Sequence, residues 1–140
     1  MTSQLDTDVI QAGFQLLRND PLIQFQDGKV ANGTPRPYIL GRAWCSYPEE
    51  SDANALDGLS RTLWVRWYLE CIGDTRESAT AMQQRARTQM LDKLLLLPGH
   101  PGVGLTLIKE DAAEQPMPAN EDTGVPVFSA RTRYKVRVTT

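Results

Sequence analysis

The chain has 140 residues, with 41% hydrophobic residues, 23% charged residues and a formal net charge of −2. This length is typical of one domain, expected here over residues 1–140, and it buries enough surface to fold without cross-links. The small charge excludes functions that need a strongly basic or acidic protein as a whole, and the longest apolar run, Leu94–Leu97, is too short to span a membrane.

The first part of the chain predicts one helix and two strands. Apolar residues recur at helical spacing over 7–18, where Asp6 or Thr7 is placed as the N-cap. Pro21 ends this helix, because the residue before a proline avoids the helical region. A short strand or hairpin arm over 22–30, a strand over Tyr38–Trp44 and a long polar loop over 46–60 then follow.

The clearest unit is one strand that leads directly into one helix. The strand is Leu63–Ile72, and its alternation predicts an apolar face on the core and a mixed, half-exposed face. Gly73 ends the strand, Asp74 is placed as the N-cap of the helix, and Glu77 is placed as its capping-box partner. Apolar residues at three-and-four spacing extend the helix to about Leu97, and Pro98–Gly99 ends it. These residues are Ala79, Met82, Ala86, Met90, Leu94 and Leu97.

The last part of the chain predicts a hairpin with an oversized turn. Val103–Glu110 is one strand, and 111–126 is an acidic, flexible arm without a cation. Val127–Val138 alternates strictly, with one apolar face and one face of four cations. The predicted fold class is therefore α+β, with a mostly antiparallel sheet, an N-terminal helix and one long helix on one face, and a terminal β-hairpin with a long loop.

No residue pattern predicts a catalytic, metal or cofactor site. His100 lies in a turn-rich segment and is interpreted as a solvated loop residue. Cys45 and Cys71 are not at the spacing of metal ligands, and they are interpreted as reduced core thiols. The carboxylates at 49–52 lie in a polar loop and are interpreted as solvated. We therefore expect a protein that is not an enzyme and has no cofactor.

The most informative feature is the row of cations on the last strand. It is either a solvated outer face, a surface that meets acidic residues of another chain, such as those at 110–122 or 49–57, or a track for DNA phosphates. The negative net charge and the lack of interleaved aromatics argue against DNA binding as a main role. Trp64 and Tyr68 are either covered by a helix or are anchors in a subunit interface. The candidate interface residues are Arg131, Arg133, Lys135, Arg137, Trp64, Arg66, Tyr68 and Glu70.

In the order and type of its elements the chain resembles the tail terminator and tail completion proteins of long-tailed bacteriophages. The resemblance rests on five segments: LLRNDPLI at 16–23, GTPRPYILGRA at 33–43, LWVRWYLECIGD at 63–74, RESATAMQQRARTQMLDKL at 76–94, and the closing basic strand. It covers most of the chain, although each motif is weak by itself. The long insertion at 46–60 departs from the family pattern, and it leaves open which loop contacts which partner.

The resemblance implies a structural role in the virion tail or neck, with the host cytoplasm as the site of assembly. Proteins of this family form rings, commonly of six subunits, that cap the tail tube, stop its polymerisation and join it to the head. The implied partners are further copies of the chain, the tail tube protein and a head–tail connector or stopper protein, with DNA passing through the lumen without sequence-specific binding and no membrane. The alternatives are a head-side connector or stopper protein and a small ligand-binding α+β domain with Trp64 and Tyr68 in its pocket wall.

Overall fold

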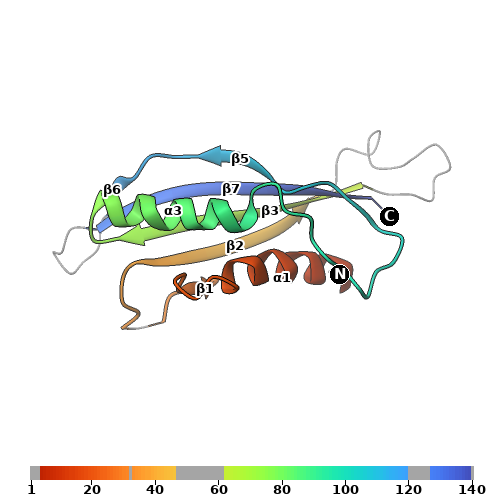
Figure 1. The fold of residues 1–140 in the computed structure, drawn as a ribbon, viewed down its shortest axis with the longest axis horizontal. Helices are drawn as coiled ribbons and strands as arrows, with labels where there is room; N and C mark the ends of the chain where they lie inside the picture. The colour runs from red at the N-terminus through yellow and green to blue at the C-terminus, as the bar shows by residue number, and fades with distance from the viewer. Residues whose placement is uncertain (1–3, 32, 47–61, 120–126, 140) are drawn as a thin grey trace.

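A computed structural model describes residues 4–31, 33–46, 62–119 and 127–139. The helices in these parts are α1 (Gln4–Arg18) and α3 (Arg76–Met90), and the strands are β1 (Phe25–Asp27), β2 (Tyr38–Ser46), β3 (Thr62–Gly73), β4 (Gly104–Leu105), β5 (Lys109–Ala113), β6 (Met117–Ala119) and β7 (Val127–Thr139). They form one sheet in the order β1-β2-β3-β7-β4, and β5 and β6 also pair with β7 (Figure 1). Only the β1–β2 pairing is parallel. The predicted α+β fold with a mostly antiparallel sheet is confirmed.

The two long central strands, β3 and β7, alternate as predicted. The apolar face of β3 is buried, with Trp67 and Val65 fully inaccessible to solvent. The matching face of β7 buries Tyr134 and Val136, and the four cations lie on its opposite face. Side chains of successive strand residues point to opposite faces, so this periodicity alone determines which residues enter the core.

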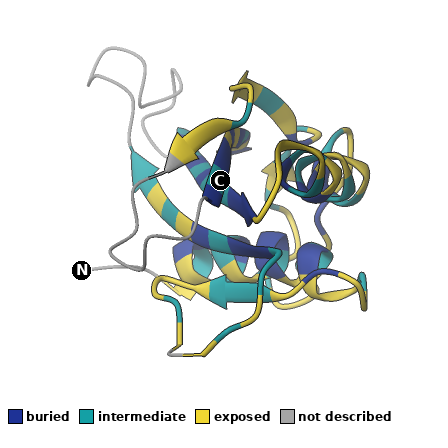
Figure 2. Ribbon diagram, turned by 90° about the vertical axis from the view of Figure 1, so that its left-hand side faces the viewer, coloured by how far each residue is buried: buried dark blue, intermediate teal, exposed yellow. Residues whose placement is uncertain are grey.

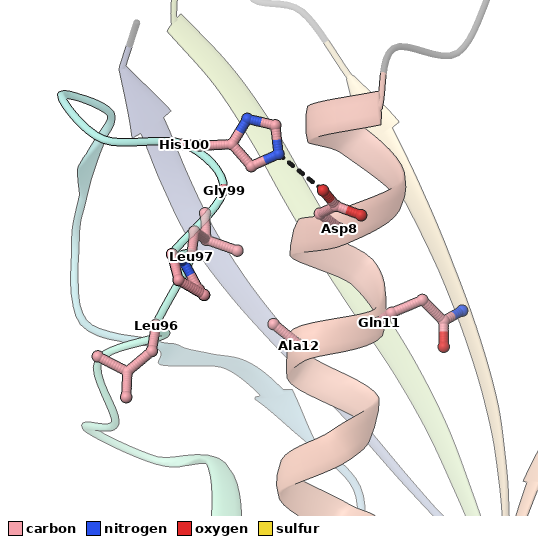
Figure 3. A pocket seen from close by; sticks show the side chains of 8 residues that line it. Asp8, Gln11, Ala12, Leu96, Leu97, Gly99 and His100 are labelled. Atoms are coloured by element: carbon pink, nitrogen blue, oxygen red, sulfur yellow. Dashed lines mark hydrogen bonds and ion pairs between the residues drawn. The ribbon is translucent and has the colours of Figure 1, made fainter.

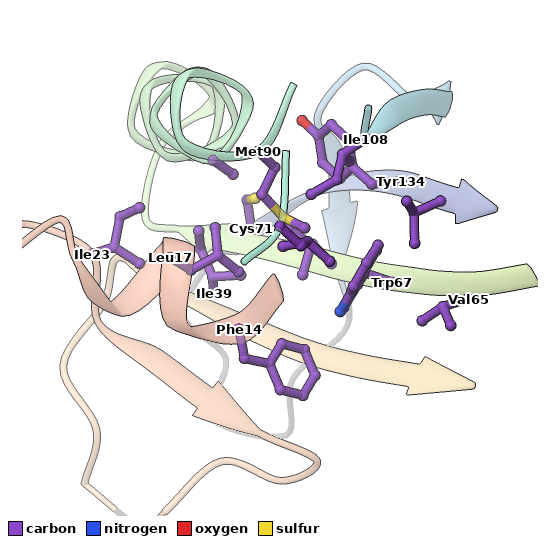
Figure 4. Close-up of a cluster of buried hydrophobic side chains, with 14 of the residues drawn as sticks. Phe14, Leu17, Ile23, Ile39, Val65, Trp67, Cys71, Met90, Ile108 and Tyr134 are labelled. Carbon is purple, nitrogen blue, oxygen red and sulfur yellow. The ribbon is translucent and has the colours of Figure 1, made fainter. Parts of the chain in front are cut away.

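Both helices cover the same face of the sheet, and the core lies between them and β3 and β7 (Figures 2 and 4). α1 buries Val9, Phe14 and Leu17, each in the apolar stripe of an amphipathic helix. α3 buries Ala79, Met82, Ala86 and Met90, which confirms the first four residues of its predicted stripe. Burial of each large apolar side chain stabilises the fold by about 1.5–3 kcal/mol. No helix of the described residues is both long and apolar enough to cross a membrane.

The predicted N-cap of the long helix is wrong. Thr75, not Asp74, is the N-cap: its hydroxyl oxygen accepts a hydrogen bond from the backbone N–H of Ser78 at 3.0 Å. Ser78, not Glu77, completes the capping box, because its hydroxyl lies 3.2 Å from the backbone nitrogen of Thr75. Asp74 instead forms an ion pair with Arg36 at 2.6 Å.

The predicted end of the helix is also wrong, because α3 ends at Met90 rather than near Leu97. After Met90 the backbone N–H of Asp92 donates to the carbonyl oxygen of Ile108 at 2.8 Å, and Ile108 N–H donates to the carbonyl oxygen of Lys93 at 2.9 Å. Asp92 takes a positive φ of 59°. These tertiary hydrogen bonds override the helical propensity of the leucine-rich segment, so Pro98–Gly99 does not end the helix.

Three further boundaries differ from the predictions. α1 begins at Gln4, so Asp6 lies inside its first turn and is buried. The short strand expected over 22–30 is present as β1, although it is confined to Phe25–Asp27, and its parallel pairing with β2 excludes the alternative of a hairpin arm. Val103–Glu110 is not one strand, because only Gly104–Leu105 and the residues from Lys109 onward pair with β7. Part of the arm predicted to be flexible forms β5 and β6, which both pair with the long strand β7. Most of the predicted loop at 46–60, as well as 120–126, lies outside the described residues.

Candidate assembly interface

The strand register brings all eight predicted interface residues onto one face of the sheet. β3 and β7 are neighbours, and the directly opposed pairs are Trp64–Arg137, Arg66–Lys135, Tyr68–Arg133 and Glu70–Arg131. Both helices pack on the opposite face, where the core lies. We name this surface, which the two helices leave uncovered, the open sheet face. The sequence indicated the two halves separately, but only the pairing of β3 with β7 unites them.

Cations cover the aromatic rings of the open sheet face. The Arg66 guanidinium and the Lys135 ammonium lie 5.7 and 5.4 Å from the centroid of the Trp64 ring. The Arg133 guanidinium lies 5.4 Å from the centroid of the Tyr68 ring. These distances are typical of cation–π contacts, which attract each cation to the negative face of the ring. Aromatic residues are therefore interleaved with the cations across the strands, contrary to the expectation from the last strand alone.

Acidic residues of the same chain meet part of the cation row. Asp111 of β5 forms an ion pair with Lys135 at 3.3 Å. The backbone N–H of Glu114 donates to the carbonyl oxygen of Arg131 at 2.8 Å, and both residues line a cavity of about 220 Å³. The sequence analysis considered acids of another chain as partners of the cation row, whereas the ion pair between Asp111 and Lys135 forms within one chain. Arg133 and Arg137 are exposed beside it.

Two residues of β2 extend the open sheet face, and the sequence analysis missed them. Arg42 lies opposite Tyr68, and Trp44 lies opposite Arg66, so both share the face of those residues. Arg42 is exposed, and 42% of the surface of Trp44 is accessible. The two-residue spacing of Arg42 and Trp44 in the predicted strand already indicated that their side chains share one face. Only the register of β2 with β3 shows that this is the face of Tyr68 and Arg66.

The environment of the open sheet face changes the acidity of Tyr68. Burial of the ring raises the pKa of the Tyr68 hydroxyl above its ordinary value, and the nearby Glu70 carboxylate raises it further. Arg131 and Arg133 act in the opposite direction but less strongly than burial. Tyr68 is therefore a neutral hydrogen-bond donor at physiological pH.

One end of the open sheet face is closed by a small apolar cluster. Tyr38, Ile72 and Val127 are buried together, and Val30 and Leu40 pack against them. This cluster lies on the same face as the cations because Ile72 and Val127 share the parity of Glu70 and Arg131 along their strands. The charged and aromatic residues occupy the remainder of the face, away from this end.

On the helix side of the molecule, His100 is not a fully solvated loop residue. Its Nε2 lies 2.7 Å from a carboxylate oxygen of Asp8 in α1, and only 21% of the His100 side chain is accessible (Figure 3). The hydrogen bond from His100 lowers the pKa of the Asp8 carboxyl below its ordinary value, and a second hydrogen bond from Gln4 acts in the same direction. A cavity of about 360 Å³ lies beside this pair.

The remaining sequence interpretations concern metal and thiol chemistry. Cys45 and Cys71 are both free thiols, as expected. Among the described residues no group of three or more His, Cys, Asp or Glu side chains is placed to hold a metal ion. The carboxylates at 49–52 lie outside the described residues.

Comparison with known proteins gives a match at the level of structure only. No family model and no curated protein matches the sequence. Among solved structures, a chain from the virion of a native gene transfer agent (GTA) particle superposes with a TM-score of 0.70. The superposition covers 99% of this chain and 100% of that chain, at 13% sequence identity. The two chains share a fold.

Proposed function

We propose that this chain is a structural virion protein of a phage-like particle, and that it acts as a tail terminator. The observation that carries the proposal is the shared fold, because the superposition extends over both chains from end to end and the other chain belongs to a virion. The order of elements that resembles the terminator family supports the finer assignment.

The open sheet face supports a function in assembly. It presents Trp44, Arg42 and the eight predicted residues on one surface that neither helix covers. Tryptophan, tyrosine and arginine are the residues most enriched at the energetic centres of protein interfaces. In this proposal the face contacts another subunit or another virion protein, and the chain acts as a homo-oligomeric ring.

The test of the proposal has two measurements. Negative-stain microscopy and light scattering of the purified chain measure whether it forms closed rings, with six subunits expected. Addition of the chain to polymerising tail tube protein measures tube length, which a terminator limits by capping the growing end. A chain that stays monomeric at high concentration and neither binds nor shortens tubes would contradict the proposal.

The same experiment separates the terminator from a head-side connector or stopper protein. A connector or stopper binds at the head vertex and leaves the length of polymerising tubes unchanged. A small ligand-binding domain is the remaining alternative, and it would place a pocket at Trp64 and Tyr68. Neither residue lines the cavities of about 360 and 220 Å³, and cations cover both rings.

A further inference from the structure

The leucine-rich segment after α3 places two of its leucines outside the fold. Because the segment is extended rather than helical, successive side chains alternate between the core and solvent. Leu95 is buried and Leu97 packs against the core, whereas 55% of Leu94 and 81% of Leu96 is accessible. A helix through this segment would have placed Leu94 in the core stripe instead.

The two exposed leucines border a groove along α1. One hollow of about 360 Å³ and another of about 210 Å³ both include Ala12 and Leu96 in their walls, so they adjoin each other. We name the pair the leucine groove. Leu16 and Leu94 line one end of it, and the Asp8–His100 pair lies at the other end (Figure 3). Exposed apolar side chains gathered around a hollow are typical of a protein interaction site.

The leucine groove and the open sheet face lie on opposite sides of the molecule. The groove lies between α1 and the segment 94–100, on the side of the sheet that holds the core. The open sheet face is the other side of the same sheet. An interface that joins one surface of a subunit to a different surface of the next generates rings when the rotation closes.

The groove and the open sheet face carry groups of opposite charge. Asp8 lines the groove, and 37% of its side chain is accessible. On β2, β3 and β7 the open sheet face holds one acid, Glu70, and six cations, which are Arg42, Arg66, Arg131, Arg133, Lys135 and Arg137. Attraction between Asp8 and these cations favours encounter of the groove with the open sheet face, and repulsion among the cations disfavours encounter of two open sheet faces.

We propose that the leucine groove of one copy receives the open sheet face of the next copy in a head-to-tail contact. This inference rests on the proposed ring, and it names the two surfaces that build it. The apolar partners are the groove leucines and the exposed Trp44, whereas Asp8 at the groove end meets the cations. Both surfaces are then buried in the ring, which accounts for the accessibility of Leu96.

Two variants, each defective in one surface, test the head-to-tail contact. The groove variant carries Leu94→Gln and Leu96→Gln, and the face variant carries Arg131→Glu and Arg133→Glu. All four side chains are accessible, so each variant should keep the thermal midpoint of the wild-type monomer. The matched control is Leu22→Gln with Leu107→Gln, which changes two leucines that are 61% and 41% accessible and line neither hollow.

Light scattering and sedimentation measure the assembly of each variant alone and of an equimolar mixture. We expect each variant alone to be monomeric, with the Kd for assembly raised about ten-fold or more, and the control to assemble like wild type. The mixture should form a 1:1 dimer that does not grow, because the intact face of the groove variant enters the intact groove of the face variant.

Three other results would overturn the inference. A dimer of either variant alone would mean that like surfaces pair. Normal assembly of the groove variant would mean that the groove receives a different virion protein, although the ring itself would stand. A wild-type chain that never assembles would overturn the proposed function together with this inference.

Discussion

The indole N–H of Trp67 donates a hydrogen bond to the backbone carbonyl oxygen of Ile10, 3.2 Å away. Trp67 is fully buried in β3, and Ile10 lies 57 residues earlier in α1. A buried indole N–H without a partner costs about 1–3 kcal/mol, so this contact favours one position of α1 on the sheet. Since α1 forms one wall of the leucine groove, the same contact also determines the shape of the groove.

Gly13 allows the close approach of α1 to Trp67. A Cβ atom at this position would overlap the atoms of the Trp67 indole. Alanine favours a helix over glycine by about 1 kcal/mol, but overpacking of a rigid ring costs more. We expect Gly13→Ala to lower the free energy of unfolding by roughly 1–3 kcal/mol in urea denaturation. Gly99→Ala is the control, because a Cβ there meets nothing within 4 Å. Equal stability of the two variants would contradict the close approach.

The capping box of α3 gives a second prediction about stability. Thr75→Ala removes the acceptor for the Ser78 N–H and should lower the free energy of unfolding by about 0.5–2 kcal/mol. Asp74→Ala removes only an exposed ion pair with Arg36, and it should cost less than about 1 kcal/mol. Thermal or urea denaturation of both variants measures the difference. A larger loss of unfolding free energy for Asp74→Ala than for Thr75→Ala would indicate that Asp74 is the N-cap, as the sequence predicts.

The sequence predicted those parts of the fold in which one periodicity extends over a long element. The alternation of β3 and β7 and the first four stripe residues of α3 are correct because each pattern repeats over many residues and has one interpretation. The end of α3 could not be predicted, because Leu94–Leu97 fits a helix as well as a strand. The hydrogen bonds between Asp92, Lys93 and Ile108 decide between them, and these residues are distant in sequence.

The candidate interface shows the same limit. Each strand indicated its own half, Trp64 to Glu70 on one and Arg131 to Arg137 on the other. Their union depends on β3 and β7 being neighbours in one register, which no local pattern encodes. The ordering of β5 and its contact between Asp111 and Lys135 could not be predicted either, because the composition of the segment is typical of flexible chain.

The two thiols should differ in their reaction with a disulfide reagent. Burial raises the pKa of Cys45 to about 11 and that of Cys71 to about 12. At pH 8 only about one Cys45 thiol in a thousand is ionised, and the thiolate is the reactive form. We expect slow reaction of Cys45, which is half-buried, and reaction of Cys71 only at the rate of unfolding. Cys45→Ser should leave no reactive thiol in the native protein, whereas rapid reaction of this variant would show that Cys71 is accessible.

The contact between Asp8 and His100 should make stability depend on pH in the acidic range. The hydrogen bond from His100 lowers the pKa of Asp8 in the folded state below its value of about 3.9 in the unfolded chain. A lowered folded pKa means that the stabilising contribution is complete above the unfolded pKa and is lost as pH falls through the folded pKa. Urea denaturation of wild type and Asp8→Asn should therefore differ at pH 6 and converge below about pH 4. A difference that persists at the lowest pH would contradict this linkage.

Reversal of charge on the cation row should weaken assembly more than it destabilises the monomer. Arg131 and Arg133 are exposed, so Arg131→Glu with Arg133→Glu should change the monomer unfolding free energy by less than about 1 kcal/mol. The control is Lys29→Glu with Arg76→Glu, which makes the same change in net charge at two exposed cations away from the open sheet face. Light scattering across a range of salt concentrations measures assembly, which should weaken with salt in the wild type because exposed charges are screened. Assembly that neither the reversal nor salt affects would exclude the cation row from the interface, and equal weakening by the control would assign the effect to net charge alone.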